Sequence, residues 1–308
     1  MRILIIGAGA MGSLFAAMLA PHADVRLLTS NQDHENAINK HGLQIYGLDG
    51  QLRQIKVQLA SDTVQDHQSA DLVLICTKAG ATAKAAQAAR RYLAPHGLAL
   101  TLQNGLGNRE KIATQVGEMR TMAGTTAQAA TLLAPGQVRH AGSGMTYLGL
   151  HKAQKAGVAQ IAALFNRAGI ACEQSEHIDR LIWSKLIVNV GINALAAILR
   201  VPNGVLANIP ECGRLMEAAV AEAVAVAQAL ALDFALSEQV EKVRQVCAET
   251  SANHASMLQD VVRGKTTEVD VINGAIVAKG KEVGVATPVN ALLTQIIKAL
   301  EATVAYRI

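Results

Sequence analysis

The sequence predicts two domains, an α/β domain with a mostly parallel sheet followed by an all-α domain. Over the first half of the chain, short β-branched and leucine-rich runs alternate with helical patterns, which is typical of a parallel sheet covered by helices. Strand patterns end near residues 172–178, and the remainder of the chain has helical periodicity. We therefore expect domains at residues 1–173 and 174–308, because 308 residues are enough for two substantial cores.

The composition excludes several classes of protein. A hydrophobic fraction of 51% with 17% charged residues indicates a folded globular chain and excludes a mostly disordered one. A net charge of +4 without a basic run, together with only 3% aromatic residues, argues against nucleic acid or a membrane surface as a partner. A small anionic ligand fits this mild charge equally well. The sequence leaves the oligomeric state open, a homodimer included.

The expected location is the cytoplasm. Four scattered cysteines without CxxC spacing predict reduced thiols, with no structural zinc or other metal site. The amino-terminal residues enter a strand-like run at once, without signal-peptide architecture. The most apolar later segments are interrupted by Lys185 in one and by Glu217 and Glu222 in the other, which indicates buried helices and not membrane spans.

A glycine motif directly follows the first predicted strand, residues 2–6, and leads into an apolar helical segment. In this setting Gly7 permits the tight turn, Gly9 lets the backbone approach a pyrophosphate, and Gly12 allows the helix and strand to pack closely. The motif therefore predicts a Rossmann-like domain that binds a dinucleotide. Its contacts are expected from Gly7, Ala8, Gly9, Ala10, Met11 and Gly12.

The end of the second predicted strand, residues 25–29, should contact the adenosine ribose. An acidic residue there would bind the 2′-hydroxyl of NAD, but no acid occurs before Asp33. The absence of a carboxylate favours NADP, with Ser30 and Asn31 as candidate phosphate contacts. The alternative for these two residues is a turn position and a helix N-cap.

A β-hairpin is expected between residues 41 and 59, where apolar residues alternate with period two around Asp49-Gly50. Two buried parallel strands follow, and they end at Lys78 and at Gln103-Asn104. Ligands of parallel sheets lie beyond the carboxyl ends of the strands, so Lys78 and Asn104 are candidate site residues. Each one alone could be an ordinary polar loop residue. Further strands are expected at residues 121–126, 137–140 and 146–150, before a helical pattern from residue 154.

Lys185 is the candidate catalytic residue. It is spaced by four residues from Asn189, and Asn189 by four from Asn193, so the three side chains share one face of a helix that is otherwise apolar. A buried lysine is costly unless something pairs with it. Without further context, a lysine that reaches the surface beside two satisfied core amides explains the pattern equally well. The motif Pro202-Asn203-Gly204 is expected to end this helix.

Polar residues also gather in the last third of the chain. Ser256 and Asp260 share a helix face, and Thr266 and Thr267 could cap a helix whose first turn contains Glu268 and Asp270. Acids in the first turn of a helix are commonly structural, and that is the first interpretation of Glu268 or Asp270 taken alone.

These stretches together resemble the ketopantoate reductase family over nearly the whole chain. The amino-terminal glycine motif is shared by many dehydrogenases, whereas the combination of the lysine helix with the last two stretches is far more specific. The segments that carry the resemblance are GAGAMG at 7–12, TK at 77–78, QNG at 103–105, GTT at 124–126, WSKL at 183–186, PNG at 202–204, SMLQD at 256–260, TEVD at 267–270 and ING at 272–274.

The resemblance implies an NADPH-dependent reduction of 2-dehydropantoate, a 2-keto acid, in the biosynthesis of pantothenate and coenzyme A. It also implies a Rossmann domain followed by a helical domain, with catalysis in the cleft between them. Lys185 would be the proton donor to the nascent alkoxide. Hydride delivery to a ketone builds negative charge on oxygen, so the site needs a cation or an acid within hydrogen-bond reach, and Lys185 suits that role. Glu268 would offset the cost of burying Lys185, because burial lowers the lysine pKa and the carboxylate raises it. Substrate contacts would come from Asn104, Asn189, Asn193, Asn203 and Ser256, and cofactor contacts from Asn104, Ala130 and Glu268.

One departure from the family concerns the cofactor. Family members often have an arginine for the 2′-phosphate at the end of the second strand, where this chain has Ser30. The preference for NADPH is therefore less secure than the reaction type. Related enzymes on this scaffold reduce other 2-keto acids, and a protein that binds the dinucleotide without chemistry is the alternative from a different functional class.

Overall fold

The computed structural model describes residues 1–60, 69–149 and 155–306, and the chain forms two compact units. The first unit comprises Met1–Gln103 and Asn108–Asp179, and the second comprises Asn104–Gly107 and Arg180–Ile308. The boundary expected at about residue 173 falls within the strand β12 (Cys172–Ser175). Because β12 pairs with β11 (Thr146–Gly149), the first unit extends beyond that strand.

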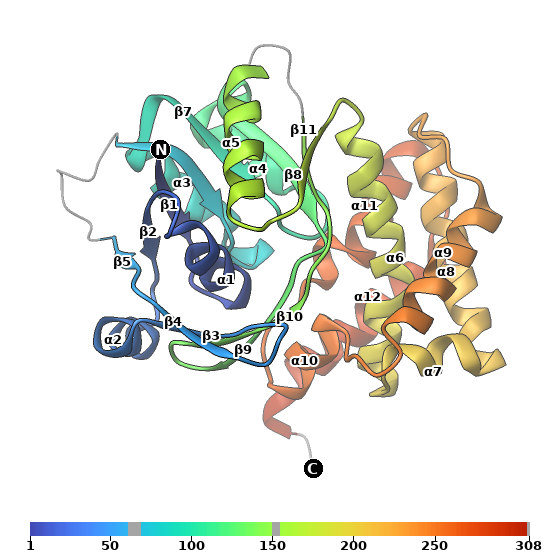
Figure 1. Ribbon diagram of the computed structural model, residues 1–308. Helices are drawn as coiled ribbons and strands as arrows, with labels where there is room; N and C mark the ends of the chain where they lie inside the picture. The colour runs from blue at the N-terminus through green and yellow to red at the C-terminus, as the bar shows by residue number, and fades with distance from the viewer. Residues whose placement is uncertain (61–68, 150–154, 307–308) are drawn as a thin grey trace. The chain divides into compact units, whose positions relative to one another are not determined.

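An eight-stranded sheet forms the centre of the first unit (Figure 1). Its order is β12-β11-β8-β7-β6-β1-β2-β5, and every neighbouring pair is parallel except β11 with β8. The predicted, mostly parallel sheet is thus confirmed. The chain runs outward from β1 in both directions, so the switch in strand order lies beside β1. The other strands are β1 (Arg2–Ile6), β2 (Asp24–Leu28), β5 (Gln58–Leu59), β6 (Ala70–Ile75), β7 (Leu93–Thr101) and β8 (Thr121–Thr126).

Helices cover both faces of this sheet because successive side chains of each central strand point to opposite faces. Ile3 and Ile5 of β1 belong to one core, whereas Leu4 and Ile6 belong to the other. The first core is closed by α1 and α5, and the second by α3 and α4 (Figure 1). The helices of this unit are α1 (Ala10–Leu19), α2 (Gln32–His41), α3 (Thr82–Tyr92), α4 (Asn108–Val116) and α5 (Lys155–Arg167).

A separate four-stranded sheet has the order β4-β3-β10-β9. The predicted hairpin is confirmed, since β3 (Leu43–Tyr46) pairs antiparallel with β4 (Leu52–Ile55). Gly50 has a positive φ of 75°, which suits a glycine in this turn. The parallel pairing of β3 with β10 (Gln137–Gly142), and the strand β9 (Ala129–Ala134), are additions that the sequence pattern did not indicate.

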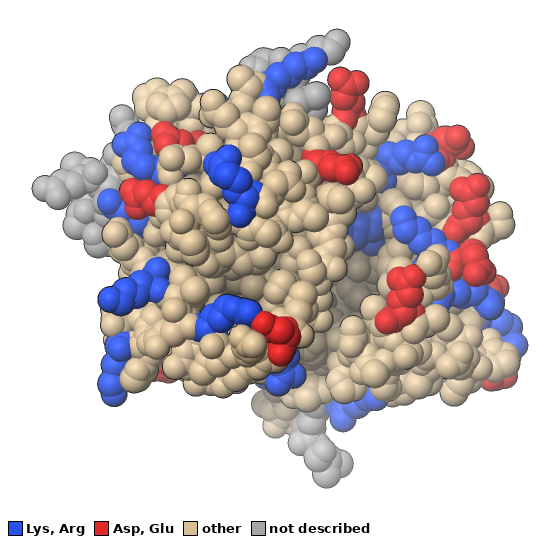
Figure 2. All heavy atoms as spheres, viewed as in Figure 1, with Lys and Arg blue, Asp and Glu red and all other residues tan. Residues whose placement is uncertain are grey.

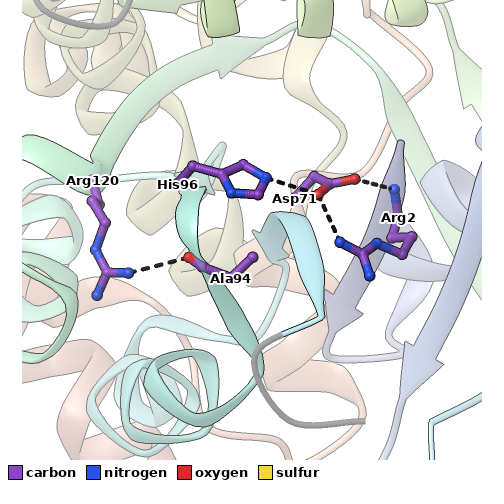
Figure 3. Close-up of polar contacts among 5 residues, drawn as sticks. All are labelled: Arg2, Asp71, Ala94, His96 and Arg120. Carbon is purple, nitrogen blue, oxygen red and sulfur yellow. Dashed lines mark hydrogen bonds and ion pairs between the residues drawn. The ribbon is translucent and has the colours of Figure 1, made fainter.

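Polar contacts join the amino-terminal ends of neighbouring strands in the large sheet (Figure 3). The Asp71 carboxylate accepts hydrogen bonds from the backbone N–H of Arg2 at 2.8 Å and from the Arg2 guanidinium at 3.2 Å, and it lies 3.2 Å from His96 Nε2. The Arg120 guanidinium donates to the Ala94 carbonyl at 3.3 Å. Because these contacts lie at the strand edge away from the glycine motif, we assign them a structural role.

The second unit contains helices and no strand among its described residues, as predicted. By length and composition α6 also qualifies as a membrane span, but 67% of its most apolar window is buried inside the protein, as in the core helix of a soluble protein. The helices are α6 (Ile178–Leu199), α7 (Asn203–Asn208), α8 (Pro210–Ala229), α9 (Leu236–Glu249), α10 (Ser256–Val262), α11 (Asn273–Val283) and α12 (Pro288–Ala302).

The segment around Glu268 differs from the expected capped helix. Thr267 does accept a hydrogen bond from Val269 N–H at 3.1 Å, but only a short 3₁₀ helix, η5 (Val269–Val271), follows, and α11 begins at Asn273. The expectation of an α-helix with Glu268 in its first turn is therefore wrong. Glu268 occupies the N-cap position of the 3₁₀ turn, so its side chain belongs to a loop.

A buried polar network joins four helices of this unit. Glu222 of α8 accepts hydrogen bonds from the backbone N–H groups of Val289 and Asn290 at 2.8 and 2.9 Å, which caps α12. The Asn290 amide also donates to Glu222 at 2.7 Å and to the Ala219 carbonyl at 3.0 Å. The Asn273 amide of α11 donates to Asn290 Oδ1 at 3.0 Å and to the Val190 carbonyl of α6 at 3.4 Å. This network ties α6, the lysine helix, to α8, α11 and α12.

Candidate functional site

The glycine motif begins with a turn that only glycine accommodates well. Gly7 has a φ of 104°, and its N–H donates to the Leu28 carbonyl at the end of β2 at 3.0 Å. A Cβ at this position would lie 2.8 Å from the Thr77 backbone nitrogen, a distance too short for a Cβ atom in contact with another residue. The turn therefore brings the backbones that follow β1, β2 and β6 together at the switch in strand order.

The other two glycines of the motif differ in what surrounds them. A Cβ on Gly12 would lie 1.9 Å from the Gly7 carbonyl oxygen and 3.1 Å from Cys76 Cβ, so this residue permits close packing of α1 against the strands. A Cβ on Gly9 would meet nothing within 4 Å, and Gly9 is exposed. Free space over Gly9, at the N-terminus of α1, suits the approach of a pyrophosphate. Ala8 is buried, and Ala10 and Met11 form the first turn of α1.

The end of β2 has no arginine or acidic side chain. Ser30 is exposed, and Asn31 caps α2 by accepting a hydrogen bond from the His34 backbone N–H at 3.0 Å. The N-cap alternative for Asn31 is thus confirmed, which leaves the Ser30 hydroxyl as the candidate contact to the ribose side of a nucleotide.

The loop after β6 carries Lys78, which is exposed and precedes a 3₁₀ turn, η2 (Ala79–Ala81). Gln103 at the end of β7 fixes this loop, because its amide donates to the Thr77 carbonyl at 2.6 Å and to Thr82 Oγ1 at 2.9 Å. The Thr77 hydroxyl oxygen is buried without a hydrogen-bond partner among the described residues. A buried hydroxyl beside the glycine turn is the kind of group that a bound nucleotide satisfies. Ala130 is partly buried on β9, opposite His140 of β10.

Asn104 belongs to the helical unit although β7, which precedes it, belongs to the sheet. The Leu106 N–H donates to the Val271 carbonyl at 3.0 Å, and a Cβ on Gly105, whose φ is 82°, would lie 2.2 Å from that oxygen. The segment Asn104–Gly107 is therefore held against η5, directly after Glu268. The structure thus places Asn104 and Glu268 on neighbouring segments of one unit.

Lys185 lies on α6 between the buried residues Ser184 and Leu186 and is itself partly buried. Burial lowers its pKa from 10.5 to about 8, and the negative charge of Glu268 acts in the opposite direction. The predicted opposition of these two effects is confirmed. An ammonium group with a pKa near 8 is protonated at neutral pH and can still release its proton, which is the property that an acid catalyst needs.

The carboxamides and the hydroxyl proposed for substrate binding differ in environment. Asn193 is buried and Asn189 partly buried on the Lys185 helix, while Asn203 is buried at the first position of α7. Asn189 Nδ2 and Asn203 Oδ1 are buried without a hydrogen-bond partner among the described residues. The other amide atom of Asn203, Nδ2, donates to Thr250 Oγ1 at 2.9 Å, which fixes its orientation. Ser256 is exposed as the first residue of α10.

The structure adds residues that local patterns did not single out. Besides Gln103 and Thr77, the side chain of Lys242 on α9 donates to Ser184 Oγ, next to Lys185, at 2.7 Å. His34 joins three segments of the first unit through its ring nitrogens and its backbone N–H. A polar residue at the end of a predicted strand could have indicated Gln103. Nothing local distinguishes Lys242 or His34, because their partners lie far away in the sequence.

On the face drawn in Figure 2, basic and acidic side chains are interspersed among larger uncharged areas. Within residues 1–60, 69–149 and 155–306, no group of three or more His, Cys, Asp or Glu side chains is placed to hold a metal ion, and the four cysteines are free thiols.

Known proteins are similar to this chain over almost its whole length. Two family models match, "Ketopantoate reductase PanE/ApbA" at residues 3–153 and "Ketopantoate reductase PanE/ApbA C terminal" at residues 177–301. The 2-dehydropantoate 2-reductase of Halobacterium salinarum is 38% identical, over 97% of this chain and 98% of the relative. The enzyme of the same name from Pyrococcus abyssi is 36% identical, over 98% of each chain.

Two solved structures are similar throughout. A ketopantoate reductase of the PanE/ApbA family from Ralstonia eutropha JMP134 aligns with a TM-score of 0.90 and 32% identity, over 98% of this chain and 99% of that one. A D-mandelate dehydrogenase, solved with NADH and anilino(oxo)acetate, aligns with a TM-score of 0.93 and 31% identity, over 98% and 99%.

Proposed function

The chain belongs to the ketopantoate reductase PanE/ApbA family, and on that basis we propose that it is a 2-dehydropantoate 2-reductase. In this proposal it reduces the keto group of 2-dehydropantoate with NADPH, giving (R)-pantoate for pantothenate and coenzyme A biosynthesis in the cytoplasm. Full-length relatives of that name at 38% and 36% identity support the assignment.

The observation that carries the proposal is the state of Lys185. Its pKa of about 8 reflects burial opposed by Glu268, and it shares a helix face with Asn189, whose Nδ2 is buried without a partner among the described residues. The charge and the free amide hydrogens are suited to an alkoxide and to a hydroxyl or carboxylate of a small acid.

The nucleotide supplies a hydride when bound, and the residues of the glycine motif fit it. Gly9 leaves space at the N-terminus of α1, and Gly7 and Gly12 keep the turn close to the strands. During reduction, Lys185 would stabilise the negative charge that develops on the substrate oxygen and then donate its proton to that atom. Glu268 would keep the lysine charged before the reaction, while Asn104, Asn189, Asn193, Asn203 and Ser256 would orient the substrate.

Steady-state oxidation of NADPH with a panel of 2-keto acids tests the proposal. We expect 2-dehydropantoate to have the highest specificity constant, above its analogues without the hydroxymethyl group or the geminal methyl groups. A higher constant for another keto acid would reassign the substrate. Binding of NADPH without oxidation in the presence of any keto acid would instead indicate a non-catalytic dinucleotide-binding protein.

A second candidate function is a reductase of an aromatic or other 2-keto acid that uses NADH. The observations that favour it are the similarity to the D-mandelate dehydrogenase solved with NADH and the exposed Ser30 where family members often have an arginine. Adding phenylglyoxylate, the keto acid of mandelate, to the panel with each nucleotide separates the two candidates. The first predicts a preference for 2-dehydropantoate with NADPH, and the second predicts a preference for phenylglyoxylate with NADH.

A further inference from the structure

A buried chain of hydrogen bonds runs through His34 from the turn between β9 and β10 to the glycine motif. The backbone N–H of Gly136 donates to His34 Nδ1 at 2.9 Å, so Nδ1 carries no proton. The proton of the neutral ring is therefore on Nε2, which lies 3.1 Å from Ser13 Oγ and donates to it. The Ser13 hydroxyl then donates to the Ala8 carbonyl, inside the glycine motif, at 3.3 Å.

This chain of hydrogen bonds connects the segments expected to hold the nucleotide. Ala8 lies between the two glycines that form the turn and face the pyrophosphate, and Ser13 lies in the first turns of α1. The backbone N–H of His34 donates to the Asn31 side chain, directly after Ser30 at the ribose end of the site. Gly136 forms the turn between β9 and β10, and β9 contains the candidate cofactor residue Ala130.

The residues of this hydrogen-bond chain are buried, and its contacts require a neutral imidazole. His34 is 2% exposed and Ser13 is fully buried. Burial lowers the pKa of His34 below its usual 6.5. A second ring proton would sit on Nδ1 and face the Gly136 N–H, so two donors would oppose each other. Protonation therefore breaks the hydrogen bond between the ring and Gly136 in the β9–β10 turn. It also displaces the ring relative to Ser13 and α2.

The charged and titratable groups on the elements around His34 do not offset this effect. They are Asp33, Glu35, Lys40 and His41 on α2 itself, Asp24 and Arg26 on β2, Tyr46 on β3, and Arg139 and His140 on β10, while α1 and β9 carry none. The lowered pKa of His34 has burial as its cause, with no contribution from a charged neighbour.

We infer that His34 is a positioning residue for the dinucleotide: its neutral ring holds the Gly136 turn and, through Ser13, the Ala8 carbonyl, and nucleotide affinity falls in mild acid when the ring takes up a second proton. The inference rests on the proposed function only in that the first unit binds a pyridine nucleotide. It predicts that the affinity for the nucleotide falls only at pH values below about 6.5, the ordinary pKa of histidine. It predicts no such loss above that pH.

Calorimetric titration with NAD⁺ and NADP⁺ between pH 5.5 and 8 tests this inference. NAD⁺ is the informative probe because it lacks the titrating 2′-phosphate. For the wild-type protein we expect Kd for NAD⁺ to rise on the order of tenfold between pH 7.5 and 5.5, about the effect of one lost buried hydrogen bond. Thermal unfolding at each pH shows whether the protein stays folded.

Three variants separate positioning from general stability. His34→Gln can accept from Gly136 and donate to Ser13 but cannot titrate, so we expect near wild-type affinity at pH 7.5 and a flat profile. His34→Leu removes both contacts, and Ser13→Ala removes the link to Ala8. Both should raise Kd about tenfold at pH 7.5, about the effect of one lost buried hydrogen bond, with kcat at saturating nucleotide little changed.

The outcomes are distinct. A His34→Gln profile that follows the wild-type pH dependence would overturn the inference, as would a His34→Leu variant with wild-type affinity. If His34→Leu does not fold, the His34→Gln profile still decides. A wild-type protein that binds nucleotide but reduces no keto acid would refute only the proposed function. Failure to bind either nucleotide at pH 7.5 would refute both.

Discussion

Replacing Glu268 with glutamine should move the pH dependence of catalysis in one direction. Lys185 has a pKa of about 8 in place of 10.5, a difference worth about 3 kcal/mol in favour of the neutral amine. Glu268 is the group that opposes this shift, so the lysine pKa in Glu268→Gln should fall further. A nearby opposite charge commonly contributes about 1 to 3 pKa units. The variant lysine is then expected to titrate between about pH 5 and pH 7.

The assay is the pH profile of kcat/KM for reduction of the keto acid, which reports the pKa of the free enzyme's acid. The wild-type activity should be constant below about pH 8 and fall tenfold per unit above it. In Glu268→Gln the same decline should begin about 1 to 3 units lower, giving a loss of about fivefold or more at pH 8. At a pH below both lysine pKa values, the two proteins should differ much less.

Asp270→Asn is the matched control. Asp270 lies two positions further along the same segment but is exposed and paired with Lys298 at 2.7 Å, so its removal should leave the profile unshifted. Glu268→Asp, which retains the charge, should restore most of the wild-type profile. A Glu268→Gln profile that overlays the wild type at every pH would refute the electrostatic coupling. A uniform loss at all pH values would show that Glu268 acts only through structure.

The remaining predictions concern the acid, the glycine motif and the buried network. Lys185→Ala should keep the fold and nucleotide binding but lower turnover by about two orders of magnitude or more, as measured by stopped-flow and steady-state kinetics; near-normal turnover would remove Lys185 as the acid. Gly12→Ala should cost about 3 kcal/mol in urea unfolding because its Cβ would meet the Gly7 carbonyl. Gly9→Ala should cost less than about 1 kcal/mol and yet weaken nucleotide binding; equal destabilisation by both would contradict the assigned roles. Asn290→Ala should lower the free energy of unfolding by about 2 to 4 kcal/mol because Glu222 and Asn273 lose a buried partner, whereas the exposed Asn253→Ala should change it by less than about 0.5 kcal/mol. A small effect of Asn290→Ala would mean that water replaces its contacts.

Features encoded by short-range patterns could be predicted from the sequence. The turn at Gly7 and the hairpin at Gly50 depend on residue types that adopt positive φ, and both are confirmed. The face shared by Lys185, Asn189 and Asn193 follows from helical periodicity alone. The presence of buried parallel strands follows from their apolar runs and from the fold class that these runs indicate.

Long-range pairings could not be predicted in this way. The parallel pairing of β3 with β10 and the hydrogen bond from Gly136 to His34 join residues about one hundred positions apart, and no local periodicity records them. The segment at Glu268 misled the prediction because threonines followed by acids suit the start of an α-helix. The chain instead makes one 3₁₀ turn there before α11 begins.

The short excursion at Asn104–Gly107 determines how the protein can be dissected. The backbone enters the second unit there, returns to the first unit at Asn108, and leaves it again only after Asp179. A gene cut at that last crossing yields a carboxy-terminal fragment without the residues that cover Val271, with the Val271 carbonyl deprived of the Leu106 N–H. Any exchange of halves between related enzymes must therefore transfer this four-residue segment along with the helices to keep the hydrogen bond between Leu106 and Val271.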